Sequence, residues 1–356
     1  MQIVFDLSST QSGHKFRGIG FYTQRLYDNL KLLAKNDKSF DLVGFTGKVG
    51  VIMVSKNKNL YHFPAFSPFF FSFPLTLVNH AIITVHDLIP LQYPEKYPVG
   101  FKGKLRWQIQ KYLLKYVKKI ITDSQASKEA IISILGIKED KIAVVYPAAD
   151  KIFRKIEDEY LLNEIANKYH LPKFFLLYVG DLNWNKNVVR LAKIAIKNNL
   201  TLVVIGKQAT NKNIDRSHPW NQELVKFQRL AYKNQNLIKC LGFVPTDDLV
   251  GIYNLATCFV YPSIAEGFGL PILEAMQCAC PVITSDQSST KEIAQDAALL
   301  INPLSNKKLE ETILALVNDE HLRQQLAKQG LEQAKKFSWK KTAQQTLEVY
   351  KKVYGK

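Results

Sequence analysis

Two glutamates separated by seven residues, Glu266 and Glu274, stand in the stretch of this sequence that is best equipped for chemistry. Gly267, Gly269 and Pro271 lie between them. Glycines let backbone amides approach a ligand closely, and proline is favoured in the first turn of a helix. The N-terminus of a helix attracts an anion such as a diphosphate, while carboxylates accept hydrogen bonds from sugar hydroxyls. The pattern therefore predicts a diphosphate site with a hexose on one side and a ribose on the other.

The elements around the two glutamates must bring them to one edge of a sheet. The apolar run Cys258–Tyr261 predicts a buried strand, and the residues from Pro271 to about Ala279 predict a short helix. A further strand, Val282–Thr284, is expected after Pro281. Parallel α/β sheets bind their ligands at the carboxyl ends of the strands, which is where this loop falls. The alternative is an ordinary turn that carries two solvated glutamates.

The whole run from Glu266 to Asp286, EGFGLPILEAMQCACPVITSD, resembles the signature of the retaining GT-B glycosyltransferases of family 4. It is similar in particular to mannosyltransferase-like bacterial enzymes of polysaccharide or glycolipid synthesis. The resemblance implies an α/β fold of two Rossmann-like domains with a cleft between them. It also implies that Glu266 is catalytic and binds hydroxyls of the donor sugar, and that Glu274 binds the ribose. The residues implied to contact the donor diphosphate are Gly267, Phe268, Gly269 and Leu270.

Short β-like runs alternate with helical stretches along the sequence, a pattern typical of parallel α/β sheets. The strands expected in the first half are Ile3–Leu7, Leu42–Phe45, Ala81–Val85, Lys119–Thr122 and Ile142–Val145. Those expected in the second half are Phe174–Val179, Leu202–Ile205, Ile238–Leu241, Cys258–Tyr261, Val282–Thr284 and Leu299–Ile301. The pattern therefore predicts two α/β halves.

A polar segment, Pro147–Pro172, separates the two groups of strands. At 356 residues the chain exceeds one ordinary core, so we expect two domains, 1–150 and 151–337, joined near residues 147–155. The resemblance implies that the first domain lies on the acceptor side and the second binds the nucleotide sugar. It also implies that a C-terminal helix within residues 338–356 crosses back to pack on the first domain.

Gly18 and Gly20 form a candidate ligand loop in the first half. They precede an amphipathic helix, where glycines either admit a phosphate to the helix N-terminus or form a structural turn. The segment resembles the GGIG-type loop that lies near the donor phosphates in the family. Phe21 replaces the arginine that usually follows, so a charge contact from that position is absent.

His86 and Asp87 directly follow a predicted strand, in the sequence VHDLIP. A single histidine at a strand end is commonly a structural residue. This segment resembles the VHDLIP segment of several family 4 enzymes, whose histidine lies beside the donor sugar. The resemblance implies that His86 is catalytic and positions the donor, with Asp87 in support.

The segment after the first predicted strand of the second half resembles the family's glycine and Arg-Lys-Asn loop, in which two cations hold the donor diphosphate. It implies a donor contact for Gly180 and a catalytic contact for Lys186. Asn185 stands at the arginine position among the implied substrate contacts, although asparagine cannot replace an arginine as an anion binder. Either Lys186 acts with helix N-termini, or Arg17 or Arg190 substitutes, or activity is weak. The alternative is a solvated surface lysine.

Two loops of the second half are predicted to line the nucleotide base. Gly206 and Lys207 follow a predicted strand directly. Phe243 and Val244 belong to the sequence GFVP, which resembles the family's GFVP-x-x-(D/E)L segment beside the base.

Composition limits the remaining classes. The cysteines, Cys240, Cys258, Cys278 and Cys280, match no disulfide or zinc pattern, which predicts reduced thiols in a cytoplasmic protein. No secretion signal is recognisable, and the most apolar window, Phe66–Val78, is too short and too broken by proline to span a membrane. The sequence offers no Asp-x-Asp pair or histidine cluster for a metal. We therefore expect no metal and no cofactor, only a GDP- or UDP-linked sugar as substrate.

The formal net charge of +17, from 48 basic and 31 acidic residues, attracts polyanions. Part of the excess lies at residues 102–119, a predicted helix. Such a basic helix either lies on an anionic membrane surface or packs its apolar face on the core with its lysines in solvent. The aromatic stretch Phe63–Phe73 adds a second candidate for membrane or acceptor contact. The residues expected on one face of the helix are Leu105, Ile109, Tyr112, Leu113, Tyr116 and Val117.

No stacking or groove-reading module accompanies the dispersed lysines, so the sequence does not favour a nucleic acid partner. The motifs and the resemblance together predict a retaining, metal-independent hexosyltransferase. It moves sugar from a nucleotide sugar to a saccharide or lipid-linked acceptor in polysaccharide or lipopolysaccharide-type glycolipid synthesis. We expect it in the cytoplasm, with the inner face of the membrane as a docking surface. The alternative is a GT-B-fold protein that binds a nucleotide sugar with little or no transfer, which the replacements Asn185 and Phe21 favour.

Overall fold

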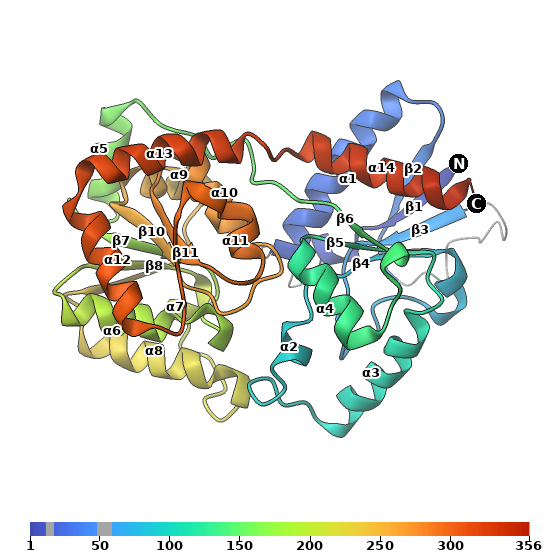
Figure 1. The fold of residues 1–356 in the computed structure, drawn as a ribbon, viewed down its shortest axis with the longest axis horizontal. Helices are drawn as coiled ribbons and strands as arrows, with labels where there is room; N and C mark the ends of the chain where they lie inside the picture. Colours follow the sequence, from blue (N-terminus) through green and yellow to red (C-terminus); the bar gives the residue numbers. More distant parts are fainter. Residues whose placement is uncertain (12–17, 48–58, 356) are drawn as a thin grey trace. The chain divides into compact units, whose positions relative to one another are not determined.

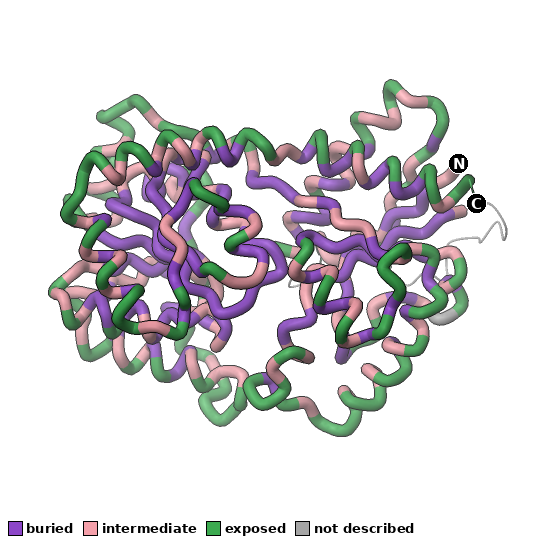
Figure 2. Tube along the Cα trace, in the orientation of Figure 1, coloured by how far each residue is buried: buried purple, intermediate pink, exposed green. Residues whose placement is uncertain are grey.

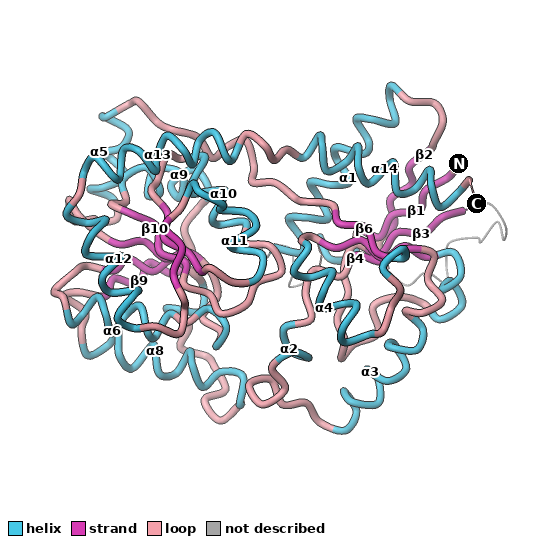
Figure 3. Tube along the Cα trace, in the orientation of Figure 1, coloured by secondary structure: helices cyan, strands magenta, loops and turns pink. Residues whose placement is uncertain are grey.

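The computed structural model describes residues 1–11, 18–47 and 59–355, and these form two compact units. Each unit is an α/β structure built on one sheet of six parallel strands. Figure 3 shows helices on both faces of each sheet. The predicted fold class, two Rossmann-like α/β domains, is therefore confirmed. The first unit contains Met1–Pro94, Val99–Ala148 and Phe337–Lys356, and the second contains Glu95–Pro98 and Ala149–Lys336.

The sheet of the first unit is parallel throughout, with Ile3 opposite both Leu42 and Leu60. Across the sheet the strands are β2 (Asp41–Phe45), β1 (Gln2–Asp6), β3 (Asn59–Phe63), β4 (Ala81–Thr84), β5 (Lys119–Thr122) and β6 (Ile142–Val144). Its α-helices are α1 (Gly18–Asn36), α2 (Ile89–Gln92), α3 (Phe101–Leu113), α4 (Gln125–Leu135) and α14 (Trp339–Tyr354). Short 3-10 turns lie at Ser8–Thr10, Leu75–His80 and Glu139–Lys141.

This sheet carries an apolar core on each face, because side chains alternate between the two faces of a strand. Ile3 and Phe5 of β1 pack in the core that α1 and α14 cover. Val4 points the other way, into a core that includes Leu114 and the α4 residue Ile131. Figure 1 shows α14 running alongside α1.

The C-terminal helix α14 completes the first unit, as predicted. Thr342 donates a hydrogen bond to the Tyr146 carbonyl, and the Tyr350 hydroxyl lies 2.5 Å from Nδ1 of His62. The other ring nitrogen of His62 lies 2.8 Å from the Thr84 hydroxyl. Burial, with the nearby His86, lowers the pKa of His62 to about 3, so this histidine is neutral. A neutral imidazole thus joins α14 to β3 and β4.

The second unit repeats the plan with another parallel sheet, whose inner strands β7, β8, β10 and β11 are buried along their whole length. Figure 2 shows this burial as a purple centre with exposed outer helix faces. Across the sheet the strands are β12 (Leu299–Ile301), β11 (Val282–Ser285), β10 (Cys258–Tyr261), β7 (Leu176–Val179), β8 (Leu202–Ile205) and β9 (Ile238–Gly242). Its α-helices are α5 (Glu159–Lys168), α6 (Val188–Lys197), α7 (Lys207–Thr210), α8 (Gln222–Lys233), α9 (Thr246–Leu255), α10 (Leu270–Gln277), α11 (Ser288–Ala294), α12 (Asn306–Asn318) and α13 (Glu320–Ala334). Short 3-10 turns lie at Trp184–Lys186, Pro219–Asn221 and Gln295–Ala297.

Two predictions about the first unit need correction. Strand β3 was not expected, because the polar His62 interrupts its apolar run and the groups that satisfy it, on Thr84 and Tyr350, are remote in sequence. Gly18 and Gly20 were expected before the first helix, but α1 begins at Gly18 and both glycines lie in its first turn.

The predicted single apolar face on residues 102–119 is also wrong. Helix α3 ends at Leu113, and the core contacts are made by Leu113, Leu114 and Val117 together with Trp107. The remaining apolar residues of the expected face point into solvent, so a core-packed helix does not account for them: Leu105, Ile109, Tyr112 and Tyr116.

In the described part of the chain, no helix combines the length and apolar composition that a membrane span requires. All four cysteines are free thiols. Burial raises the pKa of Cys258 to about 12, so this thiol is protonated at neutral pH.

Candidate functional site

The loop after β10 carries the residues of the predicted diphosphate site. β10 ends at Tyr261, and α10 begins at Leu270 with Pro271 in its first turn. Gly269, directly before the helix, has a φ of 109°, a left-handed backbone conformation that a side chain would strain. The structure therefore contains the predicted strand, loop and helix, with glycine where the backbone requires it.

The two charged residues predicted for catalysis in this unit form an ion pair. The Lys186 ammonium donates to both carboxylate oxygens of Glu266, at 2.7 and 2.8 Å, and to the Tyr261 hydroxyl at 3.0 Å. Burial alone lowers the pKa of Lys186, but the Glu266 carboxylate outweighs it and holds this pKa well above its ordinary value. Lys186 is therefore a fixed cation beside Glu266, which lies in the loop between β10 and α10.

Two serines of α11 hold the backbone that carries Glu266. The Ser288 hydroxyl donates to the Glu266 carbonyl at 2.8 Å and accepts from the Glu266 amide at 3.2 Å. The Ser289 hydroxyl donates to the carbonyls of Glu266 and Phe268, at 3.0 and 2.8 Å. Glu266 and Phe268 are thereby fixed on either side of Gly267.

Asn185, expected at the donor diphosphate, is instead buried among protein partners, with 4 % of its surface exposed. Its amide oxygen accepts from the Tyr97 hydroxyl at 2.7 Å, and its amide nitrogen donates to the Ala265 carbonyl at 2.9 Å. Its own carbonyl accepts from the Ile264 amide at 2.7 Å. Asn185 therefore fixes residues 264–265, directly before Glu266. It supplies no cation in place of the family's arginine.

Tyr97 reaches Asn185 because residues 95–98 pack on the second unit. The Tyr97 ring meets Trp220 edge-on at 5.2 Å, and the Trp220 indole donates to the Pro98 carbonyl at 3.0 Å. No sequence signal separates this stretch from the first domain.

Of the two substitute cations that the sequence suggested, the structure describes only Arg190, whose guanidinium has a partner other than Glu266. The Arg190 guanidinium donates to the Pro303 carbonyl at 2.9 Å, and Arg17 lies outside the described residues. The Asn187 amide donates to Pro303 at 2.7 Å and to Pro262 at 3.1 Å, which ties the loop to its neighbour.

Glu274 lies one turn inside α10, as the sequence predicts. The Tyr253 hydroxyl donates to its Oε2 at 3.0 Å. Burial raises the pKa of Glu274 to about 7. The hydrogen bond from Tyr253 lowers this pKa, and the charge of Asp150 raises it. This carboxyl is therefore poised between its two protonation states near neutral pH.

The predicted base-side residues follow the carboxyl ends of β8 and β9, and Gly180, predicted for the diphosphate, follows the neighbouring β7. A side chain on Gly206 would meet the Gly180 carbonyl at 2.2 Å, so these two turns need a glycine to pass each other. The Lys207 ammonium lies 4.9 Å from the centre of the exposed Phe243 ring, while Val244 is buried. Lys207 and Phe243 therefore lie in contact beside the buried Val244, and their place at the base stays a prediction.

In the first unit, His86 forms a partly buried pair with Asp123, a residue that the motifs in the sequence do not indicate. Its Nδ1 lies 2.6 Å from the Asp123 carboxylate, and its Nε2 lies 3.0 Å from the Pro64 carbonyl. Burial alone lowers the pKa of His86, but Asp123 and the Pro64 carbonyl raise it above its ordinary value. The Tyr22 ring meets the imidazole edge-on at 4.7 Å.

Asp87 accepts a hydrogen bond from the Ile89 amide at 3.0 Å, at the start of α2. The carboxylate therefore holds the turn that leads into α2, and its supporting role toward the donor stays a prediction.

Four residues of these clusters were missed: Tyr97, Asp123, Tyr253 and Tyr261. Asp123 and Tyr261 lie at the carboxyl ends of β5 and β10, where parallel sheets place ligands, and that position could have identified them. Tyr97 and Tyr253 carry no comparable signal. Within the residues described, no three metal-ligating side chains gather, and metal independence stays a prediction.

Comparison with known proteins identifies two matching families. Residues 163–333 match the family described as Glycosyl transferases group 1, and residues 55–151 match Glycosyltransferase Family 4. The chain is 30 % identical over 284 residues to O-antigen chain mannosyltransferase B of Escherichia coli, covering 77 % of this chain and 71 % of that protein. It is 27 % identical over 272 residues to the serotype-specific mannosyltransferase WbdA of Escherichia coli, covering 75 % of this chain. The match spans 33 % of WbdA, about a third of its length.

Solved structures share the fold. Sucrose-phosphate synthase from Thermosynechococcus elongatus aligns with a TM-score of 0.75 at 17 % identity, covering 100 % of this chain and 99 % of that one. HepE from Anabaena, in complex with UDP-glucose, aligns with a TM-score of 0.71 at 15 % identity, covering 99 % and 100 %. These likenesses show the GT-B fold, and the family matches with the 30 % identical relative show that the chain belongs to the glycosyltransferases of group 1 and family 4.

Proposed function

We propose that the chain transfers a hexose-type sugar from a nucleotide sugar to a saccharide or lipid-linked acceptor, with retention of configuration, in cell-surface polysaccharide or glycolipid synthesis. The observation that carries this proposal is the Lys186–Glu266 pair beside the N-terminus of α10. Relatives named mannosyltransferases and a HepE structure containing UDP-glucose support a nucleotide-linked hexose. Mannose and glucose are the first sugars to test.

Lys186 meets the leaving diphosphate in this proposal. An ammonium group has three N–H donors, and in the structure they face two Glu266 oxygens and the Tyr261 hydroxyl. Binding a phosphate oxygen therefore requires one of these contacts to be exchanged. The Tyr261 hydroxyl is the neutral partner and the weaker to lose. A fixed cation and a helix N-terminus then stabilise the charge that develops on the leaving group.

The two glutamates take the polyol contacts. Glu266 accepts hydrogen bonds from donor-sugar hydroxyls through its remaining lone pairs, while both of its oxygens stay on Lys186. Glu274 accepts from the ribose hydroxyls, with Tyr253 fixing its orientation. Lys207 and Phe243 line the base. His86, oriented by Asp123, positions the donor sugar through Nε2, whose present partner is a backbone carbonyl.

The transfer itself needs no protein nucleophile and no metal in this proposal. The bond from the anomeric carbon to the phosphate oxygen breaks, and the acceptor oxygen forms the new bond on the same face. The acceptor proton passes to the leaving phosphate.

The test is a thermal-shift screen of UDP- and GDP-linked hexoses on the whole chain, followed by Glu274→Ala. Stabilisation by one donor that is lost in this variant supports the proposal. A matched control is Glu310→Ala, which removes a carboxylate from α12 that pairs with Lys197 away from the loop. Unchanged donor stabilisation in Glu274→Ala, with no effect of the control, would contradict the ribose assignment.

A donor-binding protein without turnover is the second candidate, favoured by the braced Asn185 at the arginine position. Donor hydrolysis by the purified chain, followed as release of the nucleoside diphosphate, separates the two. Donor binding by the wild type without release of the nucleoside diphosphate would favour the second candidate.

We also propose that the first unit docks on an anionic membrane through one basic aromatic patch, which would bring it to a lipid-linked acceptor. Phe101 on α3 is 81 % exposed and Phe70 is 65 % exposed. Gln110 joins these segments, because its amide donates to the Ser67 and Pro68 carbonyls and accepts from the Ser72 amide. Residues 101–118 contain six cations and no carboxylate. Exposed aromatic rings among cations are typical of surfaces that lie on anionic lipid.

Vesicle sedimentation tests this docking. Neutralising Lys111, Lys115 and Lys118 to glutamine is expected to release the protein from vesicles of phosphatidylglycerol and phosphatidylcholine. Phe70→Ser is expected to weaken binding even at low salt, which distinguishes insertion from plain charge attraction. Lys226→Gln, Lys233→Gln and Lys307→Gln on the second unit serve as the charge-matched control. Equal loss of vesicle binding in that control would mean that the protein binds through its net charge alone.

A further inference from the structure

A groove of about 800 Å³ at the edge of the second unit's sheet contains none of the residues predicted to contact the donor. Its walls come from α7, α8, the segment between them and the first three residues of β9, Ile238–Cys240. β9 is an edge strand, and the base-side residues Phe243 and Val244 follow its other end. The volume is typical of a ligand site.

Four cations line the groove, Lys212, Arg216, Arg229 and Lys239, and the described lining includes no carboxylate. No ion pair joins any of the four to an acidic residue in the described ranges. The acids that are close in sequence have other partners, because Asp215 accepts from Ser217 and Glu223 pairs with Lys226. No carboxylate of the described lining therefore offsets the four cations, and their positive charge attracts anions.

The other lining side chains suit a saccharide. Tyr232 is 77 % exposed, and an open aromatic ring packs well against the apolar C–H face of a sugar ring. Amide side chains can both donate to and accept from sugar hydroxyls, and Asn211, Gln228 and Gln235 line the same groove. Gln228 also fixes the wall, since its amide donates to the carbonyls of Gln208 and Asn211, at 3.0 and 2.9 Å.

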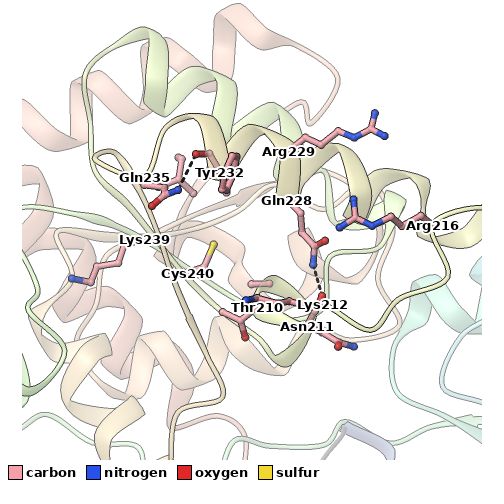
Figure 4. Close-up of a pocket in the computed structure, with 13 residues that line it drawn as sticks. Thr210, Asn211, Lys212, Arg216, Gln228, Arg229, Tyr232, Gln235, Lys239 and Cys240 are labelled. Carbon is pink, nitrogen blue, oxygen red and sulfur yellow. Dashed lines mark hydrogen bonds between the residues drawn. The ribbon is translucent and has the colours of Figure 1, made fainter.

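The groove is equipped for binding rather than for reaction. Burial raises the pKa of Cys240 to about 11, so its thiol is not a nucleophile at neutral pH. Figure 4 shows Cys240 between Thr210 and Tyr232, with Lys239 and Arg229 at opposite sides of the view. Cations spaced in this way fit an extended chain better than a compact ion.

We propose that this groove binds an anionic glycan, a saccharide chain bearing carboxylate or phosphate groups, and holds it apart from the donor site. The proposal rests on the proposed function for its class of ligand, since a glycosyltransferase handles a saccharide as acceptor and product. Binding in the groove needs no transfer, so the two proposals fail separately.

The test measures binding to the whole chain by calorimetry, with three probes of similar length. Oligogalacturonate carries carboxylates, a phosphorylated mannan fragment carries phosphates, and a malto-oligosaccharide is neutral. We expect one charged glycan to bind at least about tenfold more tightly than the neutral one, because charge-assisted hydrogen bonds are stronger than neutral ones. Which of the two charged probes binds identifies the anionic group. Absence of binding by both would overturn the proposal.

Variants locate the site. The double variant Arg216→Gln with Arg229→Gln is expected to weaken glycan binding about tenfold, the amount that two charged contacts readily supply. Tyr232→Ala is expected to weaken it while the charge stays unchanged. The control is Lys226→Gln with Lys233→Gln, which removes the same charge from α8 outside the groove. Equal weakening in the control would overturn the proposal.

Two further arms separate competing outcomes. A single-stranded oligonucleotide that binds more tightly than either glycan, with loss in the same groove variant, would make nucleic acid the ligand and overturn the proposal. Donor thermal shift is measured on every variant and is expected to be unchanged. If the wild type shows glycan binding but no donor shift, the groove assignment stands and the transferase proposal fails.

Discussion

The Lys186 ammonium donates to both oxygens of the Glu266 carboxylate across 80 residues of sequence. Only 15 % of the lysine side chain and 8 % of the glutamate side chain are exposed, so the pair is largely removed from water. Lys186 and Glu266, the two residues of the second unit that are predicted for catalysis, are thus counter-ions of each other. Removing one charge leaves the other buried and unpaired, which is a large penalty.

Lys186→Met is expected to lower the free energy of unfolding by about 3–5 kcal/mol, the usual effect of stranding one buried charge. Adding Glu266→Gln should restore most of that stability, because no charge then remains unpaired. Donor binding should be lost in Lys186→Met and should not return in the double variant. Urea denaturation measures the stability and donor thermal shift measures the binding. Return of donor binding in the double variant would show that neither charge contacts the donor.

The raised pKa of Glu274 predicts a pH-dependent donor affinity. Ribose hydroxyls donate to the ionised carboxylate, and with a pKa of about 7 this form is lost as the pH falls below 7. The donor dissociation constant should therefore rise toward about tenfold per pH unit below that pKa and level off above pH 8. Glu274→Gln should bind weakly and without this pH dependence. Calorimetry from pH 5.5 to 8.5 checks both, and a wild-type curve that is flat over this range would contradict the assignment.

The hydrogen bond from Tyr97 to Asn185 predicts a positioning role for a residue outside the motif. Tyr97→Phe leaves the buried Asn185 oxygen without its partner, which should cost about 1–3 kcal/mol of stability. Because Asn185 also holds Ala265, the loop with Glu266 should loosen and kcat should fall more than KM rises. Tyr116→Phe, which removes an exposed hydroxyl, is the control. A stability loss with unchanged kcat would leave Tyr97 a purely structural residue.

Asn185→Arg is expected to lower stability and to leave donor affinity no better than in the wild type. The position is 4 % exposed and filled by the Tyr97 and Ala265 contacts, so a guanidinium there would be buried without a carboxylate. Donor titration and urea denaturation of this variant are the measurements. Tighter donor binding would mean that the arginine position still faces the diphosphate.

Burial of His62 predicts an acid sensitivity of the first unit. Its pKa is lowered from 6.5 to about 3, so its contribution to stability is present above pH 6.5 and is lost as the pH falls. Wild type should therefore lose about 2 kcal/mol more than His62→Gln between pH 6.5 and pH 5. His86 has a raised pKa and the opposite slope, but it is common to both proteins and cancels in the difference. Parallel pH profiles in urea denaturation would contradict this role of His62.

Local sequence patterns were enough to predict the fold and the loop that contains Glu266. Strand β10, the Pro271 helix and the position of Gly269 follow from apolar runs and turn chemistry that act over a few residues. The family resemblance then assigned Lys186 and Glu266 to one site. That they pair directly could not be predicted, because the pairing depends on how β7 and β10 lie side by side.

The errors arose where distant partners decide the outcome. His62 interrupts β3 and is satisfied by Tyr350, 288 residues later. Asn185 acquires its partner Tyr97 from a stretch that belongs, in sequence, to the other half of the chain. One helical face was expected over residues 102–119, but α3 ends at Leu113, so Tyr116 and Val117 lie beyond the helix.

Helix α14 delays completion of the first unit until the end of synthesis. Its residues Ala343, Leu347 and Tyr350 close the core that β1 and α1 begin, yet the ribosome makes them only after the whole second unit. Domains generally fold as units while the chain emerges. The second unit can therefore finish folding first, while one apolar face of the first unit's sheet is covered by α1 without α14, and its remaining apolar surface is exposed to chaperones until residues 339–354 are made.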